Sequence, residues 1–389
     1  MSAETFEITK ERKIAVTLAY VAYAGETLTQ PLSGDKSVTH SILHIIEHTL
    51  PELQALQKDG VLDWRIVWGP AIYTLDLAVY QDNMMYVAQS ISDPSQYFIV
   101  IRGTNGVSIL DWAEEDFAIL RKVGWVIPEG QTADGKPEIS EATHTGLQAL
   151  LSEMVPDDGL PGAGRDISSF LRSITQTKPA SITFTGHSLA GALCEALGLW
   201  FKQFQGVEND WNPQQNAAIK IISFAGATPG NTAFANYFNA VINGQCQRIH
   251  NTNDMVPHAW EQASMEQAPD LYASIGIKFN PVLKTLVDLA SKKIDNYKQV
   301  NTSVPFTWPL QPEQDTYAKQ ALYQHVDSYI GVLEVENPRP LLDDYQQTLE
   351  TEAAQHENDP NKVATEDAQN TGFFGRVAQA IKRFLGNPE

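Results

Sequence analysis

The stretch SITFTGHSLAGALCEALGLW, residues 181–200, joins a run typical of a β-strand to a run typical of a helix. Residues 182–185 are β-branched and aromatic, and an Ala/Leu-rich segment with helical spacing comes later in the stretch. Between them lies GHSLAG, residues 186–191. This order predicts a strand, a sharp turn and a helix, an arrangement that holds a serine hydroxyl above the end of a sheet. The stretch therefore predicts that Ser188 is a nucleophile.

The residues around Ser188 are small, as such a turn requires. A serine hydroxyl becomes a good nucleophile only when a neighbouring base takes its proton, and it must stand clear of the backbone. Gly186 lies two residues before the serine, but Ala190 stands where a second glycine is usual, with Gly191 beyond it. We expect the nucleophile turn over Gly186, His187, Ser188 and Ala190. The alternative is a glycine-rich connection that carries no chemistry.

Length and composition exclude several classes of protein. The 389 residues are 43% hydrophobic, enough for a large α/β domain with its own core. The net charge of −20 argues against nucleic-acid binding through bulk charge. Two cysteines, Cys194 and Cys246, exclude a disulfide scaffold, and we expect partly buried free thiols. Neither a secretory signal pattern nor a run of 18 apolar residues occurs, so a cytoplasmic location is the default expectation, with non-classical export as the alternative.

Strands and helices are expected to alternate along most of the chain. The strand-like segments are residues 72–90, 96–102, 182–185, 219–224 and 245–251. The helix-like segments are residues 14–24, 40–58, 146–154, 167–175, 232–241 and 281–294, together with the Ala/Leu-rich stretch that follows the turn at Ser188 as far as Trp200. Alternation at this spacing predicts an α/β fold with a mostly parallel central sheet and helices on both faces.

The C-terminal part changes in composition. Residues 1–340 are expected to form one α/β domain, and residues 341–370, rich in acidic and amide side chains, a polar acidic linker. Residues 371–389 contain GFFGRVAQAIKRFLG, which predicts a short amphipathic helix with a basic face. Such a helix would bind a membrane surface or a partner, or pack back on the domain.

The partners of Ser188 can be found by elimination. Hydrolases with this turn carry the acid and then the histidine after the serine. Four histidines follow Ser188: His250, His258, His325 and His356. One lies in the polar tail and two flank the best acid candidate, Asp254, which leaves His325 as the base. Asp254 directly follows the strand 245–251, and the carboxyl ends of parallel strands are where such sheets hold their catalytic groups.

An oxyanion hole needs two donors aimed at the developing negative charge. The backbone N–H of Leu189 is the first candidate, because it follows the nucleophile. The second is Thr104, in the loop RGTNG that directly follows the strand 96–102, since it offers both a backbone N–H and a hydroxyl.

Seven segments, in order, resemble the fungal-type, class 3 lipase family over roughly residues 70–335. They are FIVIRGT (98–104), Trp112 with the acids 114–116, THTGL (143–147), TGHSLAGAL (185–193), SFAGATPGNTAF (223–234), RIHNTNDMVPH (248–258) and QHVDSYI (324–330). The resemblance implies an α/β-hydrolase fold. It also implies roles for five residues: Ser188 as nucleophile, Asp254 as the orienting acid, His325 as base, and Thr104 and Leu189 as oxyanion donors.

The resemblance further implies a lid over an acyl pocket, at about residues 105–118. Its apolar residues would be Val107, Ile109, Leu110 and Trp112. We expect the lid to open at an oil–water interface, so that lid and C-terminal helix contact a membrane or a lipid droplet. Whether Glu115 or Asp116 supports Thr104 stays open.

The sequence thus predicts a serine hydrolase that cleaves carboxylic esters of acylglycerols or related lipids through an acyl-enzyme, with no metal or organic cofactor. A phospholipase, an esterase for short-chain or aromatic esters, and a catalytically silent hydrolase-fold binding protein are the alternatives. HIIEH, residues 44–48, matches a zinc-peptidase pattern. Its polar side chains lie opposite an apolar stripe, which favours a solvated helix face instead.

Overall fold

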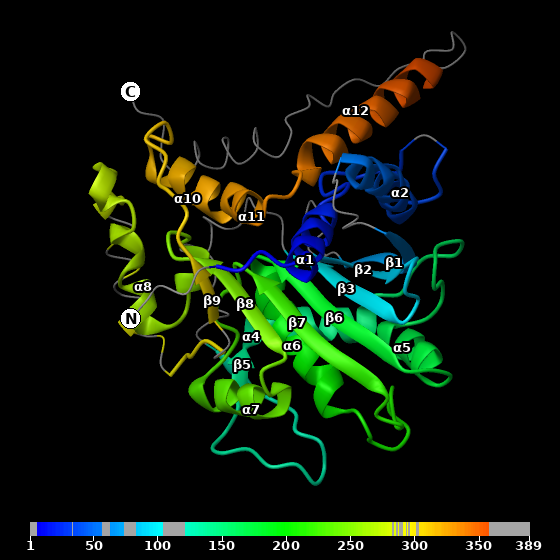
Figure 1. The fold of residues 1–389 in the computed structure, drawn as a ribbon, viewed down its shortest axis with the longest axis horizontal. Coiled ribbons are helices and arrows are strands. Elements are labelled where there is room, and N and C mark those ends of the chain that lie inside the picture. The colour runs from blue at the N-terminus through cyan, green and yellow to red at the C-terminus, as the bar shows by residue number, and fades with distance from the viewer. Residues whose placement is uncertain are drawn as a thin grey trace.

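A central sheet of seven strands organises the protein (Figure 1). The computed structural model describes residues 6–32, 34–56, 63–73, 83–103, 121–281, 284, 287, 291–292, 294, 296–300 and 303–357, the last six by their backbone alone. In sheet order the strands are β1 (Trp64–Tyr73), β2 (Asn83–Ser90), β3 (Gln96–Arg102), β6 (Ala180–His187), β7 (Ala217–Phe224), β8 (Cys246–Asn251) and β9 (Ser303–Phe306). β1, β2 and β3 pair antiparallel, and β3, β6, β7, β8 and β9 pair parallel. The expected mostly parallel sheet is confirmed.

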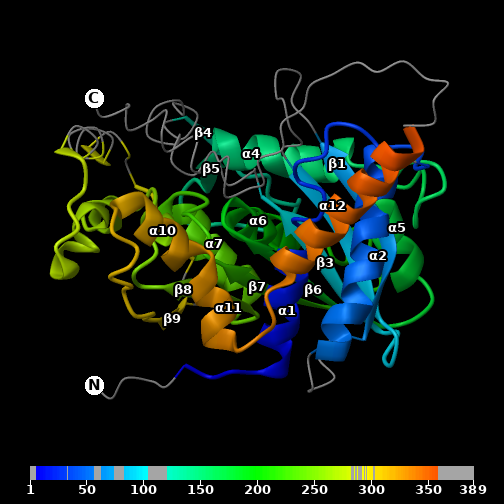
Figure 2. The ribbon, with the colours of Figure 1, turned by 90° about the horizontal axis from the view of Figure 1, so that it is seen from above.

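Helices cover both faces of the sheet, which explains why seven of the eight residues of the central strand β6 are buried (Figures 1 and 2). One face carries α1 (Lys10–Val21), α2 (Val38–Leu56), α11 (Asp327–Leu333) and α12 (Pro338–Glu357). The other carries α4 (Glu141–Gln148), α5 (Ile167–Thr175), α6 (Leu189–Gln203) and α7 (Thr232–Ile242). Each face has its own apolar core, and β6, the strand that leads to Ser188, lies between the two.

Shorter elements complete the fold. A small antiparallel pair joins β4 (Lys122–Gly124) to β5 (Glu138–Ser140), and α4 continues as the π-helical turn η3 (Ala149–Glu153). After β8 come η4 (Val256–His258), α8 (Gln262–Met265), η5 (Ala268–Asp270) and η6 (Ala273–Ile275), and α10 (Tyr317–His325) precedes α11. None of the helices in the described part of the chain is long and apolar enough to cross a membrane.

Several expected elements are confirmed with small shifts. They are the helices at 14–24, 40–58, 167–175 and 232–241, the helix after Ser188, and the strands at 96–102, 182–185, 219–224 and 245–251. The strand expected at 72–90 is confirmed at residues 72–73, in β1, and at residues 83–90, as β2, and residues 74–82 lie outside the described ranges. β1 begins earlier than expected, at Trp64, and runs through Gly69 and Pro70. β1 lies at the edge of the sheet and its register shifts between Trp68 and Ala71, and an edge strand tolerates the missing N–H of proline.

The expected helix at 146–154 instead starts at Glu141 and gives way to η3 at Ala149. Of the helix expected at 281–294, only scattered residues are described. Cys194 and Cys246 are free thiols and both are fully buried, as the composition predicted for unpaired cysteines.

The linker expected from residue 341 is wrong as far as residue 357, because α12 occupies this stretch. The composition is acidic, but Leu342, Tyr345 and Leu349 repeat at helical spacing and pack against the α1/α2 core. One narrow apolar stripe was enough to dock a mostly polar helix. The C-terminal helix expected at 371–389 lies outside the described residues.

Candidate active site

Ser188 sits in a strained turn between β6 and α6. Its backbone has φ 65° and ψ −130°, a region that non-glycine residues rarely adopt. The turn is fixed from both sides, since the Ser188 N–H donates to the Phe224 carbonyl at 3.0 Å and its own carbonyl accepts from Gly191 N–H at 2.8 Å. Strain of this kind persists only where surrounding contacts enforce it, and it clusters at functional sites.

The small residues of the turn let three backbones approach closely. A Cβ added to Gly186 would lie 2.5 Å from the Ala190 carbonyl oxygen, and one added to Gly191 would lie 2.7 Å from the Gly226 Cα. Ala190 itself is fully buried. The position where alanine replaces the usual glycine therefore has room for a methyl group, whereas the next position, Gly191, has none.

Asp254 and His325 are brought together 71 residues apart in sequence. His325 Nδ1 lies 2.8 Å from Asp254 Oδ2, and both side chains are buried. Asp254 follows β8 in a turn, and its other oxygen, Oδ1, accepts from Val256 N–H at 3.0 Å. His325 is the last residue of α10, not a loop residue before a helix. Because Nδ1 faces a carboxylate, the imidazole carries its proton there and its second nitrogen is an acceptor.

Tyr329 supports this pair. Its hydroxyl donates to Asp254 Oδ2 at 2.8 Å and accepts from the Asn251 N–H at 3.1 Å. Sequence reasoning missed this tyrosine, although it lies four residues after His325 and so on the same side of consecutive helical turns. The Asp254 carboxylate therefore accepts three hydrogen bonds, from His325, Tyr329 and the Val256 N–H, and these fix its orientation.

The other ring nitrogen of His325, Nε2, is buried and makes no hydrogen bond with any described residue. No hydrogen bond between this nitrogen and the Ser188 hydroxyl occurs in the structure. His187, next to Ser188, does contact His325, with ring centroids 4.6 Å apart. The contact with His187 brings the His325 ring next to the turn that contains Ser188, and in apo structures hydrogen bonds between catalytic side chains are often unformed.

His187 is held by polar contacts on both ring nitrogens. Nε2 lies 2.8 Å from the His325 main-chain oxygen, and Nδ1 lies 3.4 Å from the Tyr23 hydroxyl. Burial, followed by the charges of His325 and Arg339, holds the pKa of His187 well below its usual range. The ring is therefore neutral, so Nε2 donates to the carbonyl and Nδ1 accepts from Tyr23.

Arg339, on α12, extends this network. Its guanidinium lies over the Tyr23 ring at 4.3 Å and 3.7 Å from a carboxylate oxygen of Glu26. All three side chains are buried. Helix α12, which the composition placed in a linker, thus contributes a cation that is linked to His325 through three contacts, by way of Tyr23 and His187.

The candidate oxyanion donors are only partly described. Leu189 is the first residue of α6, where backbone N–H groups point out of the helix and the helix dipole is positive. Gly103, at the end of β3, closely approaches this helix start, since an added Cβ would lie 2.8 Å from the Ala190 nitrogen. Thr104 and the lid residues Val107, Ile109, Leu110 and Trp112 lie outside the described residues.

Within the described ranges no three histidine, cysteine or acidic side chains are grouped as a metal site would need. In the HIIEH stretch, His48 pairs with Glu52 at 3.1 Å and stacks on Tyr345 at 3.5 Å between ring centroids. These contacts give the motif a structural role at the α2–α12 contact.

Comparison with known proteins identifies the family of the chain. A family model described as Lipase (class 3) matches residues 98–263. M37 lipase is 33% identical, with a TM-score of 0.74 over 89% of this chain and 99% of that chain. Lip2 lipase from Yarrowia lipolytica is 16% identical, with a TM-score of 0.48 over 86% of this chain and 98% of that one. Lipase II from Rhizopus niveus is 19% identical, with a TM-score of 0.41 over 66% and 76%. The match to M37 lipase spans nearly its whole length, so the resemblance seen in the seven segments is confirmed and the chain belongs to the class 3 lipase family.

Proposed function

We propose that this class 3 lipase hydrolyses carboxylic esters of acylglycerols, with Ser188 as nucleophile, His325 as base and Asp254 as the acid that orients the base. The buried 2.8 Å contact between His325 and Asp254, beside the strained Ser188 turn, carries the proposal. Acylglycerols are proposed as substrates because the chain is similar to M37 lipase over most of its length.

The geometry supports a two-step mechanism. The Ser188 hydroxyl attacks the ester carbonyl while His325 Nε2 takes its proton. Asp254 stabilises the imidazolium that forms, and Tyr329 and the Val256 N–H hold the carboxylate in position by donating to it. The imidazolium then protonates the leaving alcohol, and an acyl group stays on Ser188.

Water completes the cycle. His325 takes a proton from water, which attacks the acyl-enzyme, and the imidazolium returns this proton to the Ser188 oxygen as the fatty acid leaves. In both steps the negative oxygen would bind the N–H of Leu189 and a donor from Thr104. Each such donor contributes about 10²–10³ in turnover in other serine hydrolases. No step of this mechanism uses a cofactor.

Hydrolysis of esters of graded chain length tests the proposal. Purified protein is assayed on nitrophenyl esters from acetate to palmitate and on emulsified triacylglycerols. We expect Ser188→Ala to lower kcat by about 10⁶. Ser173→Ala, which removes an exposed serine at the end of α5, is the matched control and should leave kcat unchanged. Covalent labelling with a fluorophosphonate should modify the wild type and the control, but not Ser188→Ala.

Several outcomes would contradict the proposal. Absence of turnover and of labelling in the wild type would indicate a silent binding protein. Activity confined to phospholipids or to short-chain esters would move the substrate class to one of the alternatives. Retained activity in Ser188→Ala would exclude this serine as nucleophile.

We also propose, from the sequence, that residues 105–118 and 371–389 contact the lipid interface. Their apolar residues and the basic face of 371–389 support this idea. Rate measured across the solubility limit of a short-chain triacylglycerol should jump as droplets form, and a smooth saturation curve would argue against it. Deleting residues 371–389 should lower co-sedimentation with liposomes.

A further inference from the structure

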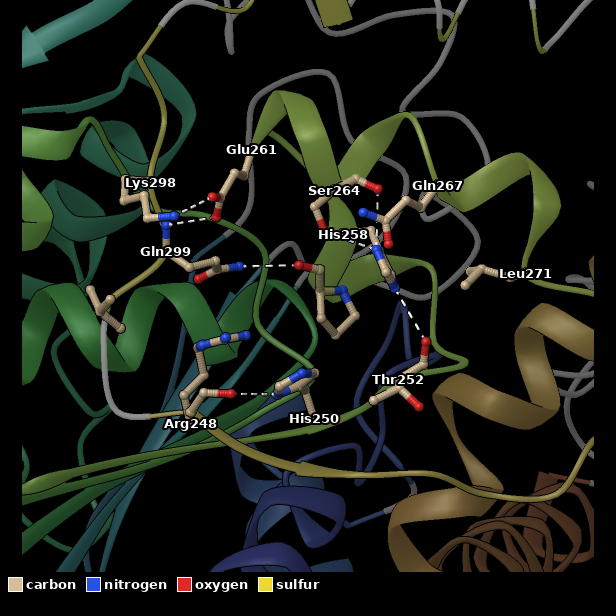
Figure 3. A pocket seen from close by; sticks show the side chains of 13 residues that line it. Arg248, His250, Thr252, His258, Glu261, Ser264, Gln267, Leu271, Lys298 and Gln299 are labelled. Carbon is tan, nitrogen blue, oxygen red and sulfur yellow. Dashed lines mark hydrogen bonds and ion pairs between the residues drawn. The ribbon is translucent and has the colours of Figure 1, made fainter. Parts of the chain in front are cut away.

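A polar cavity of about 380 Å³ lies behind the turn that carries Asp254, and the ester chemistry does not use it. Arg248 and His250 line it from β8, His258 and Glu261 from the chain after β8, and Lys298 and Gln299 from the chain before β9 (Figure 3). Only three of its described lining residues are apolar: Pro257, Leu271 and Val300. This volume suits a small ligand, and the polar lining suits a polar ligand.

Arg248 is the unusual member of this lining. It is only 7% exposed, although it carries a permanent positive charge. Its Nε is buried without a hydrogen-bond partner, and no hydrogen bond or ion pair joins its guanidinium to another described side chain. Buried charges in native proteins are nearly always paired and hydrogen-bonded, so this guanidinium lacks the acceptor that its position requires.

The nearby acids do not supply that acceptor. Glu261 is occupied by Lys298, whose Nζ lies 2.5 Å from it, and by the Gln299 N–H at 3.3 Å. Glu195, on α6, attracts Arg248 electrostatically, but its Oε1 accepts from Ser223 and its Oε2 has no partner. Burial raises the pKa of Glu195 to about 7, so near neutral pH only about half of its negative charge is present.

The positive charge of Arg248 also acts on His250. Burial and then the charge of Arg248 lower its pKa to about 3, and its ring is therefore neutral. Among described residues, His250 also lies 3.4 Å from the Ser303 hydroxyl. On another wall His258 Nδ1 lies 2.8 Å from the Ser264 hydroxyl and 3.2 Å from the Ser264 carbonyl oxygen (Figure 3).

We propose that this cavity binds a phosphate group, held by Arg248 and by Lys298. A guanidinium fork matches two oxygens of a phosphate, and an ammonium and neutral side-chain donors can bind the remaining oxygens. A carboxylate has only two oxygens and would leave part of this donor set unused. The mainly polar lining disfavours the alkyl chain of a fatty acid, which distinguishes the site from one for the lipase product.

The ligand would also stabilise the turn that carries Asp254. Thr252, Pro257 and His258 line the cavity and flank Asp254 in the chain. The His258 ring lies 3.3 Å from the Thr252 carbonyl oxygen, which ties the two ends of the turn together. A ligand that binds only the folded state raises the stability in proportion to ln(1 + [L]/Kd).

Titration with inorganic phosphate tests the site. Binding to the full-length protein is measured by calorimetry and by ³¹P line broadening, with sodium chloride holding ionic strength constant. We expect saturable binding with one site per chain and a rise in Tm. Loss of a charge-assisted hydrogen bond weakens binding by about 10–100-fold, so Arg248→Met and Lys298→Met should each raise Kd by that factor.

Lys220→Met is the matched control, because Lys220 pairs with Glu11 at 2.9 Å on the sheet face away from this cavity. It should leave Kd unchanged. If Arg248→Met fails to fold, Lys298→Met still tests the site. The Lys298 side chain is 54% exposed, so its replacement should not prevent folding. No saturable binding by the wild type, or an equal Kd in Lys298→Met and Lys220→Met, would overturn the proposal.

Two further arms identify the source of the phosphate group. Glycerol 3-phosphate competing with inorganic phosphate indicates a soluble ligand. Vesicles containing phosphatidic acid that bind the wild type but not Lys298→Met, while phosphatidylcholine vesicles bind neither, indicate a lipid headgroup. Acetate or laurate displacing phosphate at equal concentration would contradict the choice of phosphate over carboxylate.

Discussion

The Nε2 atom of His187 lies 2.8 Å from the main-chain oxygen of His325, so the residue before the proposed nucleophile holds the residue proposed to activate it. The neutral His187 ring donates to that carbonyl and receives a contact from Tyr23. The two residues are 138 positions apart, so α10 is tied to the turn between β6 and α6.

His187→Phe keeps an aromatic ring but removes this donor. We expect kcat to fall by about 10–100-fold with a small change in KM, because small misplacements of a catalytic base cost about that much. Steady-state kinetics on a soluble ester, with urea unfolding of each variant, separates positioning from stability. His40→Phe, at the start of α2, is the control. Equal kcat in the two variants would exclude a positioning role for His187.

Tyr329→Phe is expected to destabilise the protein and slow the reaction. The fully buried hydroxyl bonds both Asp254 and the Asn251 N–H, and phenylalanine removes one of the three donors to Asp254 and leaves the Asn251 N–H unsatisfied. A buried unsatisfied group costs about 1–3 kcal/mol in unfolding free energy. Urea titration measures that loss, and kcat should fall as Asp254 loses a donor. Tyr97→Phe, which loses one contact to Gln89 on β2, should keep wild-type kcat.

Glu195→Gln should stabilise the protein more at alkaline than at acidic pH. Burial raises the pKa of Glu195 to about 7, above its usual 4.5. The folded state therefore binds this proton more tightly than the unfolded state, and the resulting stability, full below pH 4.5, is lost as the pH rises to 7. Glutamine never ionises and can still accept from Ser223.

The unfolding free energy of Glu195→Gln relative to wild type should therefore be about 2–3 kcal/mol higher at pH 8 than at pH 4.5. Urea titrations at the two pH values measure this difference. Glu336→Gln, at an exposed site, serves as the control. Parallel pH dependences for Glu195→Gln and wild type would show that Glu195 ionises equally in both states.

The usual pattern of the turn has glycine at position 190, but we expect Ala190→Gly to cost less stability than Gly191→Ala. Ala190→Gly restores the usual glycine and should cost about 1 kcal/mol through lost helix propensity, with activity kept. Gly191→Ala places a methyl group 2.7 Å from Gly226 and from the Phe224 carbonyl, and overpacking should cost about 1–3 kcal/mol. Thermal unfolding of both variants measures the two losses of stability. A larger loss in Ala190→Gly than in Gly191→Ala would contradict the prediction.

Local patterns explain what the sequence predicted well. The turn at Ser188 depends on neighbours within a few residues, and the strand and helix around it follow from periodicity. The pairing of Asp254 with His325 was predicted by elimination, because few histidines follow the serine. The contacts of Tyr23 and Arg339 could not be predicted, because they join segments more than 300 residues apart. The amphipathic stripe of α12 was hidden by its acidic composition. The first part of β1, from Trp64 to Ala71, was not predicted, and it contains a glycine and a proline, which are rare inside strands.

The two sulfhydryl groups of the chain are both sealed inside it. Cys194 bonds the Gly191 carbonyl through its sulfur at 3.1 Å, Cys246 begins β8, and neither reaches solvent. Burial also raises the pKa of the Cys194 thiol, so little thiolate is present to react. A colorimetric thiol reagent added to the native enzyme therefore finds no accessible thiol. The rate at which it labels the protein measures how often α6 or β8 opens. Thiol labelling can therefore follow the unfolding of the wild type without an engineered cysteine.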